Sequence, residues 1–390
     1  MRLSIGDPRV TPRLAIITEV IAPYRIPLFN ALARRPELEL EVLFLSENDP
    51  TLRQWRVYKE EINFPYHVLP SWRRRFGGHS ILLNRGLHSA LNRLRPDVIV
   101  CGGYNYPASW HAAGWANGRR TPFLLWSEST SCDRRRSYAV VESMKRLFLR
   151  LSAGFVVPGK SSAAYLKDLG AEERKIFTAP NAIDISRFSE GADAARKNHL
   201  RSRTLHGLPQ HYFLYVGRLV KDKGVFDLLE AYAQLSPEIR AEVSLVLAGA
   251  GSQLAELKRR GSKIAPGRVQ FLDFVHREDL PAVYALADAF ILPTHTDPWG
   301  LVINEAMACS LPVIVTNVAG CAPDLVEHDW NGLIVRPGEV TALRDAMTRL
   351  ATDSQSRTQM GGRSRQRIEA YSPAAWAQGI HQAVRFACGC

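Results

Sequence analysis

Short apolar runs separated by amphipathic stretches recur along the whole chain. Four runs in the first half are typical of buried strands: RLAIITEV (13–20), PDVIVCGG (96–103), FLLWSE (123–128) and GFVVPG (154–159). The last three end in small or polar residues. LELEVLFLS (38–46) alternates Leu and Val with Glu, which predicts a strand with one open face. The stretch 27–34 predicts a helix. Strands that alternate with helices indicate a parallel sheet.

The same alternation restarts after a change of composition near residue 190. Residues 187–206 are polar, charged and poor in β-branched side chains, which predicts a linker over 191–210. Five further strands are expected at 213–217, 243–249, 269–275, 289–294 and 311–317, with helices between them and a last helix from Pro373 to about Phe386. We therefore expect an α/β protein with Rossmann-like domains over 1–190 and 211–372 and a terminal segment over 373–390.

Length and composition agree with a soluble protein of two domains. The 390 residues exceed what one hydrophobic core usually supports, and 46% apolar and 23% charged residues are ordinary values. Since no run of 18 uncharged apolar residues occurs and MRLSIGDPRV lacks a hydrophobic signal, we expect a cytoplasmic protein. The six cysteines show no C-x-x-C pair, so reduced thiols are expected and zinc is not.

The positive charge is concentrated in the first half of the chain. Residues 1–190 hold 28 Lys and Arg against 18 Asp and Glu, a net +10, whereas the other 200 residues hold 22 against 20, a net +2. The basic runs are Arg73-Arg74-Arg75, Arg119-Arg120 and Arg134-Arg135-Arg136. This asymmetry predicts an acidic partner, which is a membrane surface, a phosphorylated acceptor or nucleic acid. A solvated basic face without a partner is the alternative.

The segment 215–235 carries groups that suit a phosphate. Gly217 ends a strand, Arg218 follows it, and Lys223-Gly224 opens an amphipathic helix. The free N–H groups and the positive dipole end of a helix start attract anions. Arg adds a planar fork for phosphate oxygens, and Lys adds a compact charge. Two cations five residues apart around a turn can reach one diphosphate.

The segment 295–317 adds two carboxylates. Asp297 precedes a turn containing Gly300, where N–H groups can approach a ligand, and the following helix carries Glu305. A carboxylate in the first helical turns can accept hydrogen bonds from ribose hydroxyls. A lone Glu there more often stabilises its own helix. A glycosidase pair would place two carboxyl groups about 5–10 Å apart around one bond, but separate roles for Asp297 and Glu305 are more economical.

Taken together, these segments resemble a known family. GRLVKDKG (217–224), the 297–305 spacing, NEAMACSLPVI (304–314) and GCAPDLVEHDWNGLIV (320–335) are similar to the retaining glycosyltransferase group 1 family, of family 4 type and GT-B fold. The resemblance is dense over 150–350, and APYRIPLFNAL (22–32) and APNAIDISRF (179–188) also fit it. It implies two Rossmann-like domains facing across a cleft, with an N-terminal acceptor domain, a C-terminal donor domain and a final helix that crosses back to the N-terminal domain.

The resemblance also implies roles for single residues. Arg218 and Lys223 would hold the donor diphosphate, beside Gly217 at the strand end. Asp297 would contact the donor sugar, and Glu305 the ribose. Backbone N–H groups of Gly300, Leu301 and Val302 would touch sugar and phosphate, and the backbone near Val275 would meet the nucleobase.

The chain departs from the family pattern in three places. Asp297 stands where Glu is more common. Ala22-Pro23-Tyr24-Arg25 replaces a glycine-rich loop, so Arg25 is a candidate cation where other members use backbone N–H groups. Glu128 follows Trp126-Ser127 where many members carry a His. Tyr24, Arg25 and Glu128 are therefore candidates for acceptor or cleft contacts.

The implied reaction is transfer of a hexose from a UDP-, GDP- or ADP-sugar with retention of anomeric configuration. Because no Asp-x-Asp occurs in the chain, we expect no metal and no cofactor, with Arg218 and Lys223 in place of Mg²⁺ or Mn²⁺. Trp72-Arg73-Arg74-Arg75-Phe76 combines aromatic anchors with cations, as interfacial segments do. We therefore expect a lipid-linked or cell-envelope glycan acceptor, such as lipopolysaccharide or exopolysaccharide, and peripheral contact with an anionic membrane on its cytoplasmic face.

Three other functions compete with this one. An NAD-dependent oxidoreductase would need Gly-x-Gly-x-x-Gly after its first strand, and Gly249-x-Gly251 has no third Gly at position 254. A nucleic-acid-binding protein would explain the charge, but the aromatic residues are not interleaved with the basic runs, so no nucleic acid is expected. A GT-B-fold epimerase or phosphorylase is the nearest alternative in chemistry.

Overall fold

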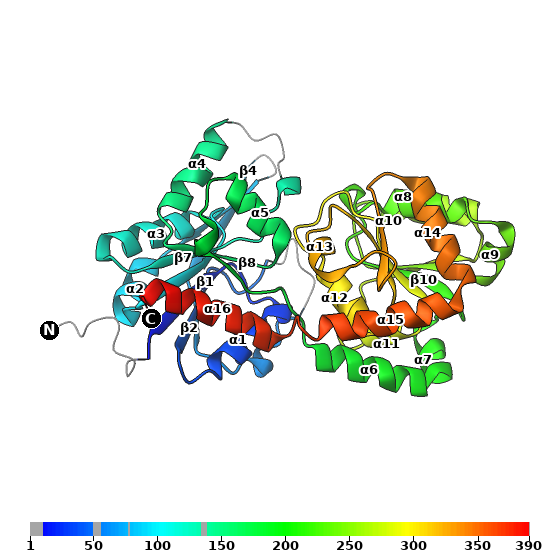
Figure 1. Ribbon diagram of the computed structural model, residues 1–390, viewed down its shortest axis with the longest axis horizontal. Helices are drawn as coiled ribbons and strands as arrows, with labels where there is room; N and C mark the ends of the chain where they lie inside the picture. Colours follow the sequence, from blue (N-terminus) through cyan, green and yellow to red (C-terminus); the bar gives the residue numbers. More distant parts are fainter. Residues whose placement is uncertain (1–10, 50–55, 77–78, 134–138, 390) are drawn as a thin grey trace. The chain divides into compact units, whose positions relative to one another are not determined.

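The chain folds into two compact units. The computed structural model describes residues 11–49, 56–76, 79–133 and 139–389. One unit holds Met1–Ile183 and Pro373–Cys390, and the other holds Asp184–Ser372 (Figure 1). Each unit contains a parallel sheet flanked by helices. The predicted α/β architecture with two Rossmann-like domains is confirmed.

The first unit is built on a seven-stranded parallel sheet. Its order is β3 (Tyr66–Val68), β2 (Glu39–Phe44), β1 (Arg13–Thr18), β6 (Val98–Gly102), β7 (Phe123–Trp126), β8 (Gly154–Val157) and β9 (Ile176–Thr178). A separate antiparallel hairpin joins β4 (Ser71–Phe76) to β5 (His79–Asn84). The helices are α1 (Ile26–Ala33), α2 (Leu87–Leu94), α3 (Pro107–Arg119), α4 (Ala139–Arg150), α5 (Lys160–Asp168) and α16 (Pro373–Cys388).

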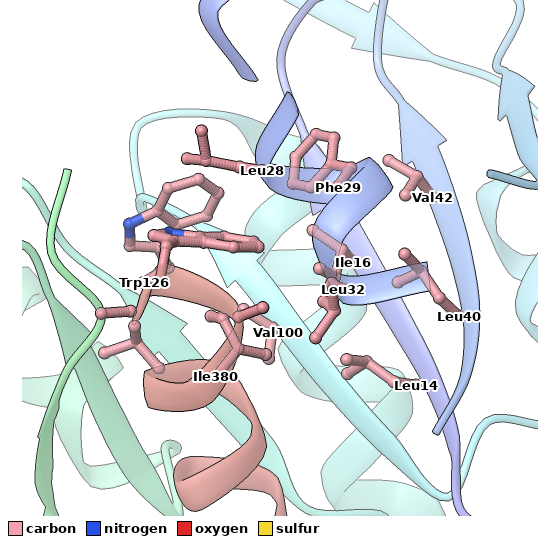
Figure 2. Packing of buried hydrophobic residues seen from close by; sticks show 14 of the residues in the cluster. Leu14, Ile16, Leu28, Phe29, Leu32, Leu40, Val42, Val100, Trp126 and Ile380 are labelled. Atoms are coloured by element: carbon pink, nitrogen blue, oxygen red, sulfur yellow. The ribbon is translucent and has the colours of Figure 1, made fainter. Parts of the chain in front are cut away.

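Alternate residues of the central strands fill two separate cores, one on each face of this sheet. Leu14 and Ile16 of β1 point into a cluster with α1 and α16, which Figure 2 shows in close-up. Ala15 and Ile17 point into the other cluster, which includes α2, α3, α4 and α5. Because side chains alternate along a strand, a strand with helices on both faces must be apolar at every position.

The last helix belongs to the first unit, as predicted. Helix α16 packs against α1 and against strands β8 and β9, and Figure 1 shows α1 and α16 side by side. Its fully buried Trp376 lies 5.5 Å from the Trp126 ring and 5.6 Å from the Phe29 ring, measured between centroids. The chain therefore returns to its first unit because an aromatic anchor completes that core.

The second unit is built on a six-stranded parallel sheet. Its order is β12 (Val269–Leu272), β11 (Ser244–Ala248), β10 (Tyr212–Val216), β13 (Ala289–Leu292), β14 (Val313–Thr316) and β15 (Gly332–Val335). One group of helices comprises α8 (Val225–Ala233), α9 (Pro237–Glu242), α10 (Leu254–Ile264) and α14 (Val340–Thr352). The other comprises α6 (Ile185–Lys197), α7 (His199–His206), α11 (Leu280–Ala285), α12 (Leu301–Ala308) and α15 (Ser354–Ile368), and a short α13 is Ala322–Leu325. Figure 1 shows α8 and α14 on one side of the sheet and α6, α11 and α15 on the other.

Two segments differ from the sequence interpretation. Residues 191–210, expected to be a linker, lie mostly in α6 and α7, which belong to the second unit. A Cβ on Gly191 would lie 2.7 Å from Cβ of Pro281, so small residues let this polar helix pack closely on α11. Helix α15 was not predicted, because Gly361-Gly362 interrupts its pattern. A Cβ on Gly361 would lie 2.3 Å from the Ser310 carbonyl oxygen, so the glycine permits this contact.

The anchoring role of α16 can be measured. Replacing the fully buried Trp376 by Ala removes a large side chain from the core, which should lower the free energy of unfolding by about 3–5 kcal/mol in urea titrations. Gln378→Ala, at an exposed position of the same helix, is the matched control and should change stability little. Equal effects of the two substitutions would contradict the packing described here.

Candidate functional site

The candidate donor residues of the second unit gather at the carboxyl edge of its sheet. Gly217 directly follows β10, Arg218 is exposed in the next turn, and Lys223 ends a short helix before α8. Asp297 lies in the loop after β13, and Glu305 lies in α12. In parallel sheets the carboxyl ends of the strands meet at one edge, where ligands bind.

An ion pair joins two of these residues across 74 positions of sequence. Lys223 Nζ lies 2.5 Å from Asp297 Oδ2 and donates a second hydrogen bond to the Thr296 carbonyl at 3.3 Å. Both side chains are largely buried, with 13% and 15% exposed. Asp297 Oδ1 accepts a hydrogen bond from the Trp299 amide at 3.2 Å. Asp297 is therefore held at both carboxylate oxygens, and it orients the ammonium group.

The two loops behind this ion pair are in backbone contact. Gly224 has φ of +66°, and a Cβ there would lie 1.9 Å from the Pro293 carbonyl oxygen. The His295 amide and the Thr294 hydroxyl both donate to the Asp222 carbonyl, at 2.9 and 3.1 Å. Only glycine adopts this left-handed conformation cheaply and leaves room for the neighbouring strand end. The loop after β10 is thus fixed against the loop after β13.

Helix α12 begins at a second left-handed glycine. Gly300 has φ of +93° and precedes Leu301 and Val302, whose amides lie in the first helical turn. Amides of a first turn have no partner within the helix and can donate to a ligand. Buried Trp299 donates from its ring to the Asn304 side chain at 2.9 Å, which holds this turn in place.

Glu305 is held by a tyrosine that the sequence interpretation did not include. The Tyr284 hydroxyl of α11 donates to Glu305 Oε2 at 2.7 Å. Burial raises the pKa of Glu305 from the ordinary 4.5 to about 7, and the Tyr284 hydrogen bond partly opposes that rise. The Glu305 side chain is still partly exposed, so it can meet a ligand. A carboxyl group with such a pKa changes charge near neutral pH.

A buried tyrosine links Arg218 with Asp297. The Tyr215 hydroxyl donates to the Arg218 carbonyl at 2.8 Å. Burial raises the pKa of Tyr215, the charge of Asp297 raises it further, and the charge of Arg218 lowers it. The pKa of Tyr284 likewise responds to both Glu305 and Tyr215. The structure therefore brings Arg218, Lys223, Asp297 and Glu305 into one electrostatic neighbourhood. The two tyrosines could be found by sequence only as apolar-pattern positions.

Val275 is the remaining residue of this unit that is predicted to bind the sugar donor. It lies half-buried in the loop after β12. Its neighbour Phe274 is an exposed aromatic residue beside the ring of His276, at 5.4 Å between centroids. The structure thus places both residues at the carboxyl end of β12. The contact of Val275 with a nucleobase stays a prediction.

The candidates of the first unit also lie together. Arg25 donates to the Thr18 hydroxyl at 2.6 Å and lies 3.2 Å from Glu128 Oε1. Its guanidinium stacks 4.5 Å above the Trp126 ring, and Tyr24 is 5.7 Å from the same group. The partnership with Tyr24 and Glu128 raises the pKa of Arg25 despite the opposing effect of burial. Arg25 is thus a neutralised, fixed cation at the carboxyl ends of β1 and β7.

The basic runs differ in their surroundings. Arg73 pairs with the buried Asp49 at 2.7 Å and faces the protein, whereas Arg74 is exposed over the Trp72 ring at 4.2 Å. Arg134-Arg135-Arg136 lies outside the described residues. Among the described residues, no helix is long and apolar enough to cross a bilayer. The same part of the chain contains no group of three or more His, Cys, Asp or Glu side chains that could hold a metal ion. The expectation that no metal is needed stays a prediction.

Two family profiles match the chain. The profile described as glycosyl transferases group 1 matches residues 197–367, and glycosyltransferase family 4 matches residues 28–187. Each profile thus corresponds closely to one structural unit.

Individual relatives are similar over shorter regions. The D-inositol 3-phosphate glycosyltransferase of Corynebacterium jeikeium is 31% identical over 53% of this chain and 51% of its own length. The O-antigen chain mannosyltransferase B of Escherichia coli is 36% identical over 34% of this chain and 35% of its own length. The chain therefore spans about half or less of these two relatives.

A solved structure covers nearly the whole chain. Anabaena Alr3699/HepE, crystallised with UDP and glucose, superposes with a TM-score of 0.74 over 96% of this chain and 100% of its own, at 18% identity. This likeness concerns the fold, which is GT-B as the sequence resemblance implied.

The raised pKa of Glu305 predicts how stability depends on pH. A carboxyl group whose pKa is raised on folding holds its proton more tightly in the folded state. Its contribution to stability is therefore present at low pH and is lost as pH rises from about 4.5 to about 7. Glu305→Gln should gain about 1–3 kcal/mol in unfolding free energy relative to the unsubstituted protein between pH 5 and pH 8.

Urea unfolding at several pH values measures this difference. Glu230→Gln, at an exposed position on α8, is the matched control. If the unfolding free energies of Glu305→Gln and of the unsubstituted protein change with pH in the same way, the carboxyl group titrates normally and the prediction is wrong.

Proposed function

The chain belongs to the group 1 glycosyltransferases of family 4 type, and we propose that it transfers a sugar from a nucleoside diphosphate sugar to an acceptor. The observation that carries this proposal is the group of Arg218, Lys223, Asp297 and Glu305 at the carboxyl edge of the second sheet, with Lys223 and Asp297 joined by an ion pair. It combines two cations with two carboxylates, which suits a ligand with a diphosphate at one point and hydroxyl groups at others.

The cations act on the leaving group. When the sugar–phosphate bond breaks, negative charge grows on the nucleoside diphosphate. An ammonium group has three N–H donors, and Lys223 directs two of them to Asp297 and Thr296, so one can meet a phosphate oxygen. Arg218, exposed at the edge of the same loop, supplies a second positive charge. Charges already held in place stabilise the transition state without reorganisation.

The remaining groups orient the donor. Glu305 in its ionised form accepts hydrogen bonds from the ribose hydroxyls, and the first-turn amides of α12, at Leu301 and Val302, donate to sugar and phosphate. Asp297 meets the donor sugar while it holds Lys223, with one carbon less reach than Glu would have. The backbone near Val275 meets the base.

Two finer features of the reaction belong to the same proposal. Retention of anomeric configuration is the first, and the resemblance to the retaining glycosyltransferases supports it. Metal independence is supported by the two cations, which supply at the diphosphate the charge that Mg²⁺ supplies elsewhere. A cofactor other than the nucleotide sugar is not required.

The acceptor is a lipid-linked or cell-envelope glycan. The similarity to an O-antigen chain mannosyltransferase supports this class. The net charge of +10 over residues 1–190 supports contact between the first unit and an anionic membrane surface. In the first unit, Arg25 with Glu128, next to Tyr24, is the group proposed to meet the acceptor, since carboxylate and guanidinium together can bind sugar hydroxyls.

Substitution of Lys223 tests the proposal. Lys223→Ala should retain the fold but lose about a hundredfold to a thousandfold in kcat, equivalent to about 2.7–4 kcal/mol, because one preorganised charge is removed from the leaving group. The measurement is release of nucleoside diphosphate that depends on acceptor, with thermal unfolding as a check of the fold. Lys221→Ala, an exposed lysine two residues earlier, is the matched control. Near-normal turnover of Lys223→Ala would refute the assignment.

A further inference from the structure

The outward face of the β4–β5 hairpin is apolar. In its register Trp72 pairs with Leu83 and Arg74 pairs with Ile81, so these four residues share one face. Trp72, Ile81 and Leu83 are 52%, 42% and 43% exposed. The inward face instead carries buried Leu82 and the ion-paired Arg73. A two-stranded ribbon normally turns its polar face to solvent.

Helix α4 carries a second exposed apolar stripe. Val141, Met144 and Leu147 are 41%, 50% and 51% exposed and recur at every third residue, which places them along one side of the helix. The inward side of α4 packs on the rest of the first unit, since Lys145 Nζ donates to the Tyr165 hydroxyl at 2.7 Å and Phe148 is fully buried. The stripe is therefore not needed for the core.

Both elements lie over the same face of the first sheet. Leu82 of β5 and Phe148 of α4 belong to one hydrophobic cluster. Helix α3 contacts β5, and its Trp110 ring lies 4.7 Å from the Phe148 ring. We name the outward hairpin face (Trp72, Arg74, Ile81, Leu83) with the α4 stripe (Val141, Met144, Leu147) the apolar–basic surface.

The charge of this region is mainly positive. Residues 71–85 contain four Arg and no Asp or Glu. Arg74, Arg85, Arg146 and Arg150 are exposed, whereas Glu142 of α4 is paired with Lys145 at 3.0 Å. Arg74 stacks on Trp72, so that a cation and an interfacial aromatic ring form one unit. Apolar side chains surrounded by Arg match the interface of an anionic bilayer, where Trp lies at headgroup depth and basic side chains extend to the phosphates.

We propose that the apolar–basic surface lies on an anionic lipid bilayer and inserts Trp72, Ile81, Leu83 and the α4 stripe to headgroup depth. This inference rests on the proposed lipid-linked acceptor, and it identifies the elements that bring the first unit to that substrate. Six of the eleven exposed large apolar side chains recorded for the described residues belong to this surface. By contrast, Leu200 and Leu205 of α7 are more exposed, but they are five residues apart and thus on different sides of their helix.

Vesicle flotation with the full chain tests the surface. The unsubstituted protein should float with phosphatidylglycerol-containing vesicles and much less with pure phosphatidylcholine vesicles. Two variants remove apolar contacts at exposed positions: Trp72→Thr with Leu83→Thr on the hairpin, and Met144→Gln with Leu147→Gln on α4. Each should reduce partition to anionic vesicles at least tenfold, because several apolar side chains no longer insert. The matched control, Leu200→Gln with Leu205→Gln on α7, should bind as the unsubstituted protein does.

Hydrogen–deuterium exchange of the unsubstituted protein gives a second measurement that needs no variant. Anionic vesicles should slow exchange in the hairpin and in α4 and leave α7 unchanged. Equal flotation with neutral and anionic vesicles, an equal loss in the α7 control, or absence of protection in both elements would overturn the inference. A dimer that the surface variants convert to a monomer, with vesicle binding unchanged, would assign the surface to a second copy and also overturn it.

Failure of the membrane proposal can be distinguished from failure of the proposed reaction. Hydrolysis of the nucleotide sugar by water depends on the second unit and should be equal in the surface variants and the unsubstituted protein. Loss of lipid binding with normal hydrolysis supports the surface. If the unsubstituted protein releases no nucleoside diphosphate under any condition, the proposed function fails whatever the flotation result.

Discussion

The ion pair between Lys223 and Asp297 is the interaction on which the candidate site depends. It connects the loop after β10 to the loop after β13, whose backbones also approach closely at Gly224 and Pro293. A largely buried ion pair contributes little net stability, since desolvation offsets the attraction. Removing one partner, however, leaves the other charge uncompensated. The pair therefore fixes the direction of an ammonium group more than it stabilises the fold.

Two buried tyrosines extend this arrangement to the other charged residues. Tyr215 donates to the Arg218 carbonyl and responds to the charge of Asp297, and Tyr284 holds Glu305. Because both tyrosines are fully buried, the charged groups that they contact are attached to the packed core of the unit. Groups that must meet a diphosphate and a ribose at fixed separation need such support. The energetic cost is visible in Glu305, whose pKa is raised to about 7 by burial.

Much of this organisation could be predicted from the sequence. Apolar runs and amphipathic stretches located most strands of both sheets, and the carboxyl ends of parallel strands then placed Arg218, Lys223 and Asp297 at one edge. The direct contacts could not be predicted, because Lys223 and Asp297 are 74 residues apart and Tyr284 resembles any other core position. Residues 191–210 were predicted to be a linker because their composition is polar. In the structure, Gly191 lets this polar helix approach Pro281 closely, and a hydrophobic pattern does not reveal such a contact. The pairing of Arg73 with Asp49 was also hidden, so that the neighbouring Arg73 and Arg74 lie on opposite faces of a hairpin.

In the proposed site, the third N–H group of Lys223 donates to the second phosphate of the nucleotide. Isothermal titration of the unsubstituted protein with a nucleoside diphosphate and with the matching monophosphate, repeated with Lys223→Ala, tests it most directly. The unsubstituted protein should prefer the diphosphate, and Lys223→Ala should lose most of this preference while it still binds the monophosphate. An unchanged preference in Lys223→Ala would contradict it.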